Sequence, residues 1–465
     1  MNRPTLFAFA LVSMFAAPAL RAGDALGAAT IKKIDAMCEP LVDAKYAVGF
    51  VVGTLKDGQT WTKGYGEFEK GKGVAPDADT LFEIGSISKT FTGLLLADAV
   101  QRKLCTFDEP MSKLLPPEAK WTDDDPPILL KHLTTHSSGL PRMPTNFAPK
   151  DPDDPYADYD DAHLYAFLAG VANSPLPRAP GDQYEYSNLA VGLLGQLMVR
   201  ANGAKSYEQL LHDRITGPLG LHDTMITIPK ELEARFTPSY DADLRLVHHW
   251  TLNALSGAGA IRSTVNDLLK FARLQIDPSG TPLEDAIDAS HTILYPLPKP
   301  NPSAKGVACG WHVSSIDALW HNGQVGGHHG FVAFDPKRQV AAVILCNSAC
   351  PQIDGLADAI FLSLMGMEKA PPPIQIPVPV DRKVLERYVG TYKLNLLAKF
   401  TIGLDEEGLT AQLTGQPAFH VFAQSQTKFA YRVVDATIDF EVDANGKTKA
   451  LVLHQNGADQ RAEKE

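Results

Sequence analysis

A run of prolines separates the chain into two parts. Five prolines lie between Ala370 and Val380, a composition typical of a semi-rigid linker. The part before it is long enough to bury a large core, and the part after it has short alternating stretches, with a hairpin signature around Asp443-Ala444-Asn445-Gly446. We therefore expect a large first domain, a linker and a small all-β barrel or sandwich, over residues 23–368, 369–380 and 381–465 respectively.

The first residues have the pattern of an export signal. Arg3 precedes an apolar stretch from Leu6 to Leu20, and Leu20-Arg21-Ala22 fits a cleavage site, with Ala17-Pro18-Ala19 as the alternative. An uncleaved anchor is the other interpretation, but the stretch is short and Pro18 interrupts it. We expect a signal peptide over residues 1–22 and a periplasmic or secreted protein without stable membrane insertion.

Charge and cysteine content exclude several classes of partner. The net charge of -11 argues against a nucleic-acid partner. Five cysteines spread over 465 residues are no disulfide framework, and we expect buried thiols with room for one bridge. Neither Cys346-x-x-x-Cys350 nor the trio His321, His328 and His329 has the spacing or helical context of a zinc site, so we expect no metal and no other cofactor.

A serine and a lysine stand three residues apart where an apolar helix begins. Ser86 and Lys89 precede the apolar run Gly93 to Val100. Residues three apart share a helix face, and a helix N-terminus favours an oxyanion over an ammonium. Lys89 could thus act as a base for a nucleophilic Ser86. A helix cap followed by a solvated lysine is the alternative, and the same pattern recurs at Ser425 to Lys428 without an apolar helix after it.

Two further motifs carry suitable chemistry. In Tyr186-Ser187-Asn188 a phenol can relay the serine proton, and Asn188 can hydrogen-bond Lys89 and a substrate carbonyl. The alternative is that Tyr186 and Asn188 merely open a helix, with Asn188 as its cap. His321-Asn322-Gly323 ends a predicted strand and is followed by Gln324, so it can offer a cation for a carboxylate and a backbone N–H for an oxyanion. His328-His329-Gly330 competes with it, but lies in a turn.

The surrounding pattern mixes helices and strands. The long Pro-, Asp- and Tyr-rich segment 143–161 has no periodicity and is typical of a lid or binding loop. The predicted helices span 31–45, 128–135, 161–172, 189–200, 206–215, 264–274 and 354–365. The predicted strands of the first domain span 47–55, 60–67, 310–314, 318–323, 331–335 and 339–346.

Together these motifs resemble those of the penicillin-recognising serine hydrolases. The resemblance rests on Phe82-x-x-Gly85-Ser86-x-Ser88-Lys89, Tyr186-Ser187-Asn188 and His321-Asn322-Gly323, and on the stretch His132 to Pro141. The chain is most similar to the class C β-lactamase and D,D-peptidase type over roughly residues 31–365, with a lipocalin-like tail. The resemblance implies an α+β fold, in which helices flank an antiparallel sheet beside an all-helical region.

The resemblance also implies roles for the residues and a substrate class. Ser86, Lys89 and Tyr186 would be catalytic, and Asn188, His321, Asn322, Gly323 and Gln324 would bind the substrate, a small peptide, β-lactam or ester. True class C β-lactamases begin the third motif with lysine, and a histidine in that place titrates near pH 6.5. This departure favours a D-Ala-D-Ala-type peptidase with weak β-lactamase activity. A lactamase-like esterase, a penicillin-binding protein with little turnover, and a homo-oligomer remain open.

Overall fold

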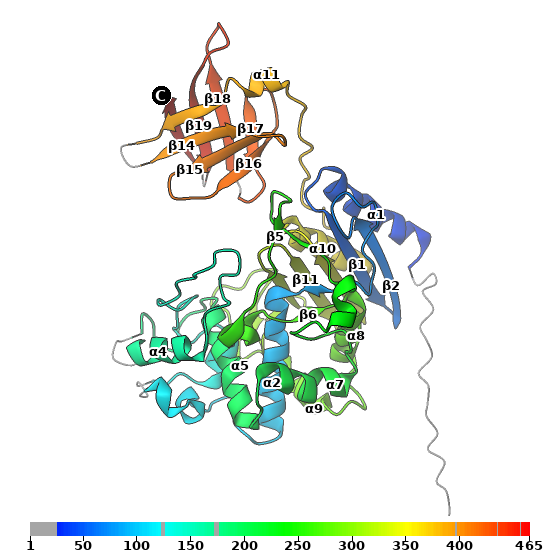
Figure 1. Ribbon diagram of the computed structural model, residues 1–465. Helices are drawn as coiled ribbons and strands as arrows, with labels where there is room; N and C mark the ends of the chain where they lie inside the picture. Colours follow the sequence, from blue (N-terminus) through cyan, green and yellow to red (C-terminus); the bar gives the residue numbers. More distant parts are fainter. Residues whose placement is uncertain (1–25, 122–125, 172–175, 396–397, 435, 456) are drawn as a thin grey trace, which may run out of the picture.

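A computed structural model describes residues 26–465, apart from 122–125, 172–175, 396–397, 435 and 456. It contains a large α+β region and a β-barrel, and a segment without helix or strand connects the two (Figure 1). This segment spans the proline-rich residues 370–380. The fold class expected from the sequence is confirmed.

An antiparallel sheet forms the centre of the first region. The first and last long strands lie side by side, since Val51 pairs with Leu345. Among the described residues the sheet has eight strands. Their order is β2 (Gln59–Gly66), β1 (Gly49–Lys56), β12 (Val340–Cys346), β11 (His329–Asp335), β10 (Leu319–Gln324), β9 (His312–Val313), β8 (Gly306–Val307) and β7 (Tyr295–Pro296).

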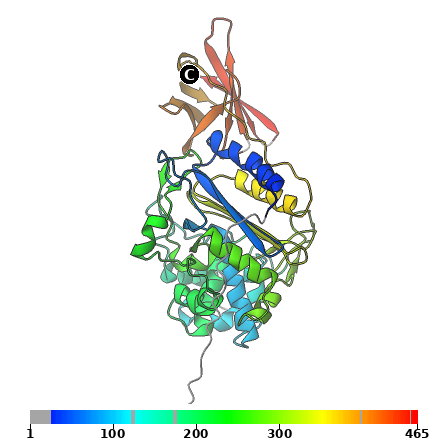
Figure 2. The ribbon, with the colours of Figure 1, turned by 90° about the vertical axis from the view of Figure 1, so that its right-hand side faces the viewer.

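Both faces of this sheet are covered, because apolar side chains alternate between two cores. Val51 and Leu55 of β1 pack into the core on the side of the large helical region. Phe50 and Val52 pack into a second core with α1 (Ala28–Asp43) and α10 (Gln352–Leu364). Successive strand residues point to opposite faces, so one continuous apolar strand can supply both layers. Figure 2 shows α1 and α10 on one face and the larger helical region on the other.

The remaining helices lie mainly on the helical side of the sheet. The long ones are α2 (Ser88–Gln101), α4 (Asp161–Val171), α5 (Asn188–Asn202) and α8 (Val265–Ile276). The shorter ones are α3 (Leu130–Thr134), α6 (Tyr207–Leu211), α7 (Gly217–Leu219), α9 (Glu284–Ser290) and, before the barrel, α11 (Arg382–Leu385). Two small ribbons join β3 (Phe82–Glu83) to β6 (Arg262–Ser263) and β4 (Ser239–Tyr240) to β5 (Leu246–Val247).

The central helix α2 is buried on every side. Every residue from Ser88 to Ala99 is buried, and the helix packs against α5 and α9. A helix that is apolar all round can exist in water only inside a core. The Ser-x-x-Lys pattern therefore begins a helix that the whole domain holds in place (Figure 1).

The C-terminal strands close into a barrel. Each strand pairs with the next, and the first pairs with the last through Tyr392 and Lys464. The strands are β13 (Gly390–Lys393), β14 (Lys399–Leu404), β15 (Leu409–Leu413), β16 (Ala418–Ala423), β17 (Lys428–Tyr431), β18 (Ala436–Val442), β19 (Thr448–Gln455) and β20 (Ala458–Lys464). Closure leaves no unpaired edge strand among the described residues of the barrel.

The barrel docks on the first region through charged and aromatic contacts. Arg432 donates to the backbone oxygen of Ala44 at 2.6 Å and lies over the ring of Tyr46 at 4.1 Å. His420 of the barrel lies between two carboxylates, 3.5 Å from Asp243 of the first region and 2.9 Å from Asp405. Its hydrogen bond to Asp243 raises its pKa above 6.5. These contacts fix the barrel beside the β4–β5 ribbon.

Other sequence expectations have mixed outcomes. The five cysteines are buried free thiols, so the bridge for which the sequence left room is not formed. No described helix is both long and apolar enough to cross a bilayer. The predicted signal peptide, residues 1–22, lies outside the described residues.

Candidate active site

The structure brings Ser86 and Lys89 into contact. Ser86 lies in a short 3-10 turn, Gly85–Ile87, that leads into α2, and Lys89 lies in the first turn of that helix. Lys89 Nζ is 2.9 Å from Ser86 Oγ and 2.6 Å from the carbonyl oxygen of Ala258. The three-residue spacing therefore places Lys89 beside the Ser86 hydroxyl, as the sequence predicts. The carbonyl oxygen of Ala258 adds a second hydrogen-bond partner for the amine.

Lys89 lies in surroundings that disfavour its charged form. Its side chain is completely buried, and it has no carboxylate partner among the described residues. Burial, together with the nearby charge of Arg142, holds the pKa of the Lys89 ammonium well below 10.5. A neutral amine can give one N–H to Ala258 and turn its lone pair toward the Ser86 hydroxyl. Lys89 can therefore accept a proton from Ser86.

Tyr186 completes the group around the Ser86 hydroxyl. Its ring centroid is 5.0 Å from Lys89 Nζ. Burial raises the pKa of this phenol, and its hydrogen bond with Ser86 opposes that shift. The ring of His136 stacks on it at 4.3 Å, and His136 Nδ1 accepts a hydrogen bond from the backbone of Ser187 at 3.1 Å. The stretch around His136 therefore supports Tyr186, a role that the sequence analysis did not assign.

Strand β10 lies against the turn that carries Ser86. A Cβ on Gly323 would be 2.0 Å from the Ile84 carbonyl oxygen and 2.9 Å from the Ser86 nitrogen. A Cβ on Gly85, whose φ is +52°, would be 2.7 Å from the Gln324 nitrogen. Such approaches are open only to glycine. They place the backbone nitrogens of Ser86 and Gln324 close together, as an oxyanion hole requires.

His321 lies beside Tyr186 and Lys89, and its protonation state differs from the one that its residue type suggests. Its side chain is 1% exposed, and its ring centroid is 6.4 Å from that of Tyr186. Burial and the neighbouring His312 and Lys89 hold its pKa well below 6.5. The expected titration near pH 6.5 is therefore wrong, and at neutral pH His321 is an uncharged imidazole. The lowered pKa argues against His321 as the cation expected for a substrate carboxylate.

The two asparagines of the motifs lie in different places. Asn188 begins α5 and lines the pocket next to Ser86, where its amide donates to Met143 Sδ at 3.8 Å. The cap of this helix is Ser187, not Asn188. The prediction that Asn322 binds substrate needs correction. Its side chain points to the opposite face of β10 and donates to Asp354 of α10 at 2.7 Å. Strand alternation separates it from His321.

The pocket beside Ser86 is lined by residues from four distant segments. Tyr156 comes from the long irregular loop that the sequence suggested as a lid or binding loop. Trp250 and Leu252 come from the segment after β5, and Val325 follows Gln324. No sequence motif identified these residues as part of the site. Composition could have indicated only the irregular loop that contains Tyr156. Their side chains add apolar surface to a pocket whose lining is about equally polar and apolar.

Arg142 is an exposed cation at this site. Its guanidinium carbon is 5.1 Å from the centroid of the Tyr186 ring. Its backbone oxygen accepts from the nitrogens of Asn188 and Leu189 at 3.0 and 3.3 Å, which fixes it to the start of α5. Among the described residues it forms no ion pair within 4.0 Å. Arg142 therefore contributes an uncompensated positive charge near Lys89.

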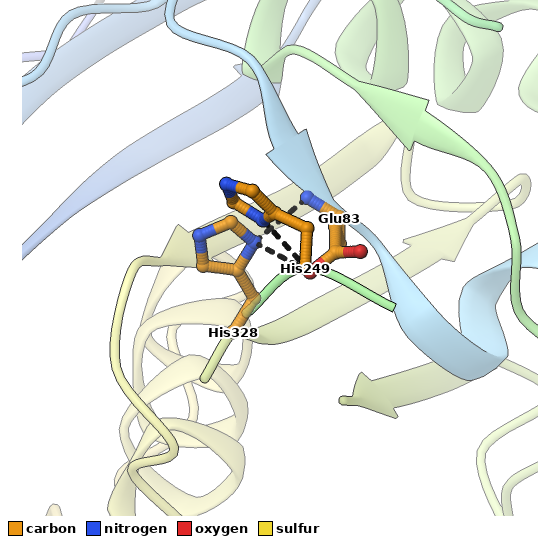
Figure 3. Close-up of side chains that lie close together, drawn as sticks. All are labelled: Glu83, His249 and His328. Atoms are coloured by element: carbon orange, nitrogen blue, oxygen red, sulfur yellow. Dashed lines mark hydrogen bonds and ion pairs between the residues drawn. The ribbon is translucent and has the colours of Figure 1, made fainter. Parts of the chain in front are cut away.

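Glu83, His249 and His328 form a compact group behind the serine turn (Figure 3). His328 Nδ1 accepts the backbone N–H of Glu83 at 2.9 Å, and His249 Nδ1 is 3.1 Å from the Glu83 carboxylate. Arg262 is 3.2 Å from that carboxylate, and the Trp250 nitrogen donates to it at 2.9 Å. With the lone pair of His328 Nδ1 occupied and the carboxylate bound to Arg262, the geometry favours an ion-pair network over a metal site.

This network links the serine turn to the pocket wall. Burial opposes ionisation of Glu83, but the hydrogen bond with His249 and the charge of Arg262 lower its pKa. The carboxylate therefore stays charged and holds the Trp250 backbone two residues from Leu252. Burial lowers the pKa of His328 to about 4, which keeps that imidazole neutral. The group thus positions the wall of the pocket.

Comparisons with known proteins agree with this geometry. A family model described as "Beta-lactamase" matches residues 34–363, and a domain of unknown function, DUF3471, matches residues 375–464. The chain is 26% identical to the D-alanyl-D-alanine-carboxypeptidase/endopeptidase AmpH of Escherichia coli K12, over 70% of this chain and 86% of that protein. It is 27% identical to a beta-lactamase of Pseudomonas fluorescens, over 69% of this chain and 94% of that protein.

Two solved structures share the fold. One is the octameric penicillin-binding protein homologue from Pyrococcus abyssi, with a TM-score of 0.64 and 20% identity, covering 93% of this chain and 100% of the other. The second is a beta-lactamase/D-alanine carboxypeptidase from Yersinia pestis complexed with citrate, with a TM-score of 0.62 and 23% identity, covering 72% and 97%. The first likeness covers both the α+β region and most of the remaining chain.

Proposed function

The chain belongs to the beta-lactamase family of serine hydrolases, and from this premise we propose that it hydrolyses D-Ala-D-Ala-type peptides of the cell wall, with weak β-lactamase activity. The observation that supports this most is the contact between Ser86 Oγ and Lys89 Nζ at 2.9 Å, in a site where the lysine is buried. The relatives named for carboxypeptidase and β-lactamase activities support the substrate class. Export to the periplasm or medium is part of the proposal.

The proposed reaction proceeds through an acyl-enzyme. Neutral Lys89 takes the proton of Ser86, and Ser86 Oγ forms a bond to the substrate carbonyl carbon. The backbone N–H groups of Ser86 and Gln324 stabilise the oxyanion. Tyr186, protonated at neutral pH, gives its proton to the leaving amine as the C–N bond breaks. Deprotonated Tyr186 then takes a proton from water as the water oxygen attacks the ester carbonyl, and Ser86 Oγ leaves with the proton that Lys89 holds. Asn188 positions the acyl amide.

A substrate panel with mass analysis tests this proposal. The protein is incubated with a β-lactam, an N-acyl-D-alanyl-D-alanine peptide and a p-nitrophenyl ester, and the products and the intact protein mass are measured. We expect peptide turnover, slow β-lactam turnover and a transient adduct on the peptide that contains Ser86. Ester turnover alone would favour an esterase, and a stable adduct without turnover would favour a penicillin-binding protein. An adduct elsewhere would contradict the mechanism.

Removing the charge of Arg142 should shift the pH dependence of acylation. Lys89 must be neutral to act as a base, so the rate rises with pH through the pKa of Lys89. Arg142 lowers that pKa, so Arg142→Gln should raise it and move the acid limb to higher pH. Because Arg142 is exposed, the shift should be modest and should shrink in high salt. Rates of acylation from pH 5 to 9 measure it.

The matched control for this charge is Arg273. Its guanidinium donates to Gly58 in the turn between β1 and β2 at 2.8 Å. Arg273→Gln removes the same charge from another part of the surface, so its acid limb should coincide with that of the unmodified protein. If the acid side of the pH–rate profile is also unchanged in Arg142→Gln, the charge of Arg142 does not affect the pKa of Lys89.

A further inference from the structure

A second pocket lies between the central sheet and α10, on the face of the sheet that Figure 2 shows covered by α1 and α10. Its volume is about 550 Å³, and small-molecule sites in proteins measure about 300–1,000 Å³. Trp320 and Asn322 of β10 and Phe331 of β11 form its floor. None of the described residues that line it also lines the pocket beside Ser86, which lies on the other face of the sheet. The proposed acyl transfer therefore does not use this pocket.

The bottom of this pocket is apolar and is held in a fixed shape. Phe331 and Phe361 are 5% and 3% exposed. The Trp320 indole stacks on Phe331 and on His312, with ring centroids 5.7 and 4.7 Å away. Its Nε1 donates to the carbonyl oxygen of Ser303 at 2.7 Å. Because these contacts already order the aromatic wall, an apolar ligand would bury surface there at little cost in side-chain entropy.

Two carboxylates lie at the mouth of the pocket. Asp354 and Asp358 are four residues apart on α10 and so share one face of that helix. Their side chains are 38% and 34% exposed, well above the rings at the bottom. Lys369 also lines the pocket, and it pairs with Asp358. The pocket thus combines an apolar interior with a polar, acidic entrance.

The Asp354 carboxylate has no lysine or arginine partner within 4.0 Å in the part of the chain that the structure describes. It accepts from the Asn322 amide at 2.7 Å and is 2.8 Å from His329 Nε2. The other nitrogen of that ring, Nδ1, is buried without an acceptor among the described residues. His329 therefore lacks the second contact that would stabilise an imidazolium. These contacts leave Asp354 able to bind a cation.

We propose that this pocket binds a linear cationic amphiphile, with its alkyl chain against Trp320, Phe331 and Phe361 and its ammonium group on Asp354. An ammonium offers three donors and a charge opposite to that of the carboxylate. A negatively charged head group would instead meet the two carboxylates of α10, and a neutral one would form no ion pair. The inference does not depend on the proposed reaction at Ser86.

Calorimetric titration with three probes of equal chain length tests the head group. The probes are octylamine, octanol and octanoate, and near pH 7 the first is a cation and the last an anion. We expect octylamine to bind most tightly, octanol about tenfold more weakly because it lacks the charged hydrogen bond, and octanoate most weakly of the three. From butylamine to octylamine, each added methylene should tighten binding about fourfold.

A variant of the carboxylate isolates its contribution. Asp354→Asn keeps the shape of the side chain and removes its charge, so octylamine should bind about tenfold more weakly while octanol binding is unchanged. The matched control is Asp288, which is exposed on α9. Asp288→Asn removes the same charge from another helix and should leave the affinities for all three probes as they are.

Two further variants locate the bound chain. Ala333 is 2% exposed and lines the pocket from β11. Ala333→Leu places a larger side chain into this space and should weaken the binding of octylamine and octanol alike. Trp250 lines the pocket beside Ser86, and Trp250→Ala should leave octylamine binding unchanged. Thermal unfolding of each variant identifies any loss of folding.

Each result supports or contradicts the proposal. It would be overturned by the absence of saturable octylamine binding, by octanoate binding as tightly as octylamine, or by an unchanged octylamine affinity in Asp354→Asn. Loss of octylamine binding in folded Trp250→Ala would place the amine in the pocket beside Ser86 and would also overturn it. If Ala333→Leu does not fold, the Asp354→Asn and Trp250→Ala variants decide.

Discussion

Replacing Ser86 by alanine should abolish covalent labelling by a fluorescent penicillin while the fold is retained. The hydroxyl is the only group lost, and Lys89 Nζ keeps its second contact, with the carbonyl oxygen of Ala258 at 2.6 Å. Without the nucleophile no acyl-enzyme can form, and loss of such a residue costs at least about a thousandfold in rate. Gel fluorescence after labelling, with circular dichroism of the same sample, measures both expectations.

The chain provides a matched control in the barrel. Ser425 and Lys428 repeat the Ser-x-x-Lys spacing, but Ser425 is exposed and its Oγ accepts from the backbone nitrogens of Thr427 and Lys428 at 3.2 and 3.0 Å. Lys428 begins β17 and has no buried helix behind it. Ser425→Ala should therefore label like the unmodified protein. Undiminished labelling of Ser86→Ala would remove Ser86 from the mechanism.

The two occurrences of this spacing show what local sequence can and cannot decide. The contact between Ser86 and Lys89 follows from helix geometry, so the sequence predicts it. The burial that lowers the pKa of Lys89 depends on α5, which begins about 100 positions further along the chain, and on the turn at Ala258, 169 positions away. The apolar residues after Lys89 were the available signal for that burial. No such run follows Lys428.

The third motif shows the opposite case. Strand alternation alone predicts that Asn322 faces away from His321, and the structure confirms that opposition through the contact with Asp354. The sequence analysis assigned both side chains to substrate, although only one of them can face it. The charge of His321 could not be predicted in this way, because burial and the neighbouring His312 come from tertiary packing.

The pocket wall depends on contacts that no motif records. Glu83 joins His249, His328 and Arg262, which lie between 160 and 250 positions further along the chain. Such networks form when strands β3 and β6 pair, where Glu83 is opposite Arg262. The barrel then docks on the β4–β5 ribbon, just before His249 and Trp250. The C-terminal domain is thus connected to the wall of the active site by continuous backbone.

Substituting Gly323 by alanine should damage both stability and acylation. The new Cβ would lie 2.0 Å from the Ile84 carbonyl oxygen, and both atoms belong to backbone that cannot rotate away. Relief requires β10 to move from the serine turn, which should cost about 3 kcal/mol. The same movement separates the nitrogens of Gln324 and Ser86, so the acylation rate of the folded fraction should fall by about a hundredfold.

A glycine outside the site separates this effect from the general consequence of adding a methyl group. Gly170 lies in α4 with no heavy atom within 4 Å of its Cβ position, so Gly170→Ala should leave acylation unchanged and stabilise the helix by up to about 1 kcal/mol. Thermal unfolding and single-turnover acylation of both variants give the comparison. A Gly323→Ala protein that unfolds early but acylates normally would show that β10 braces the serine turn without holding the oxyanion. Normal values for both quantities would mean that the close approach of β10 to Ser86 does not exist in solution.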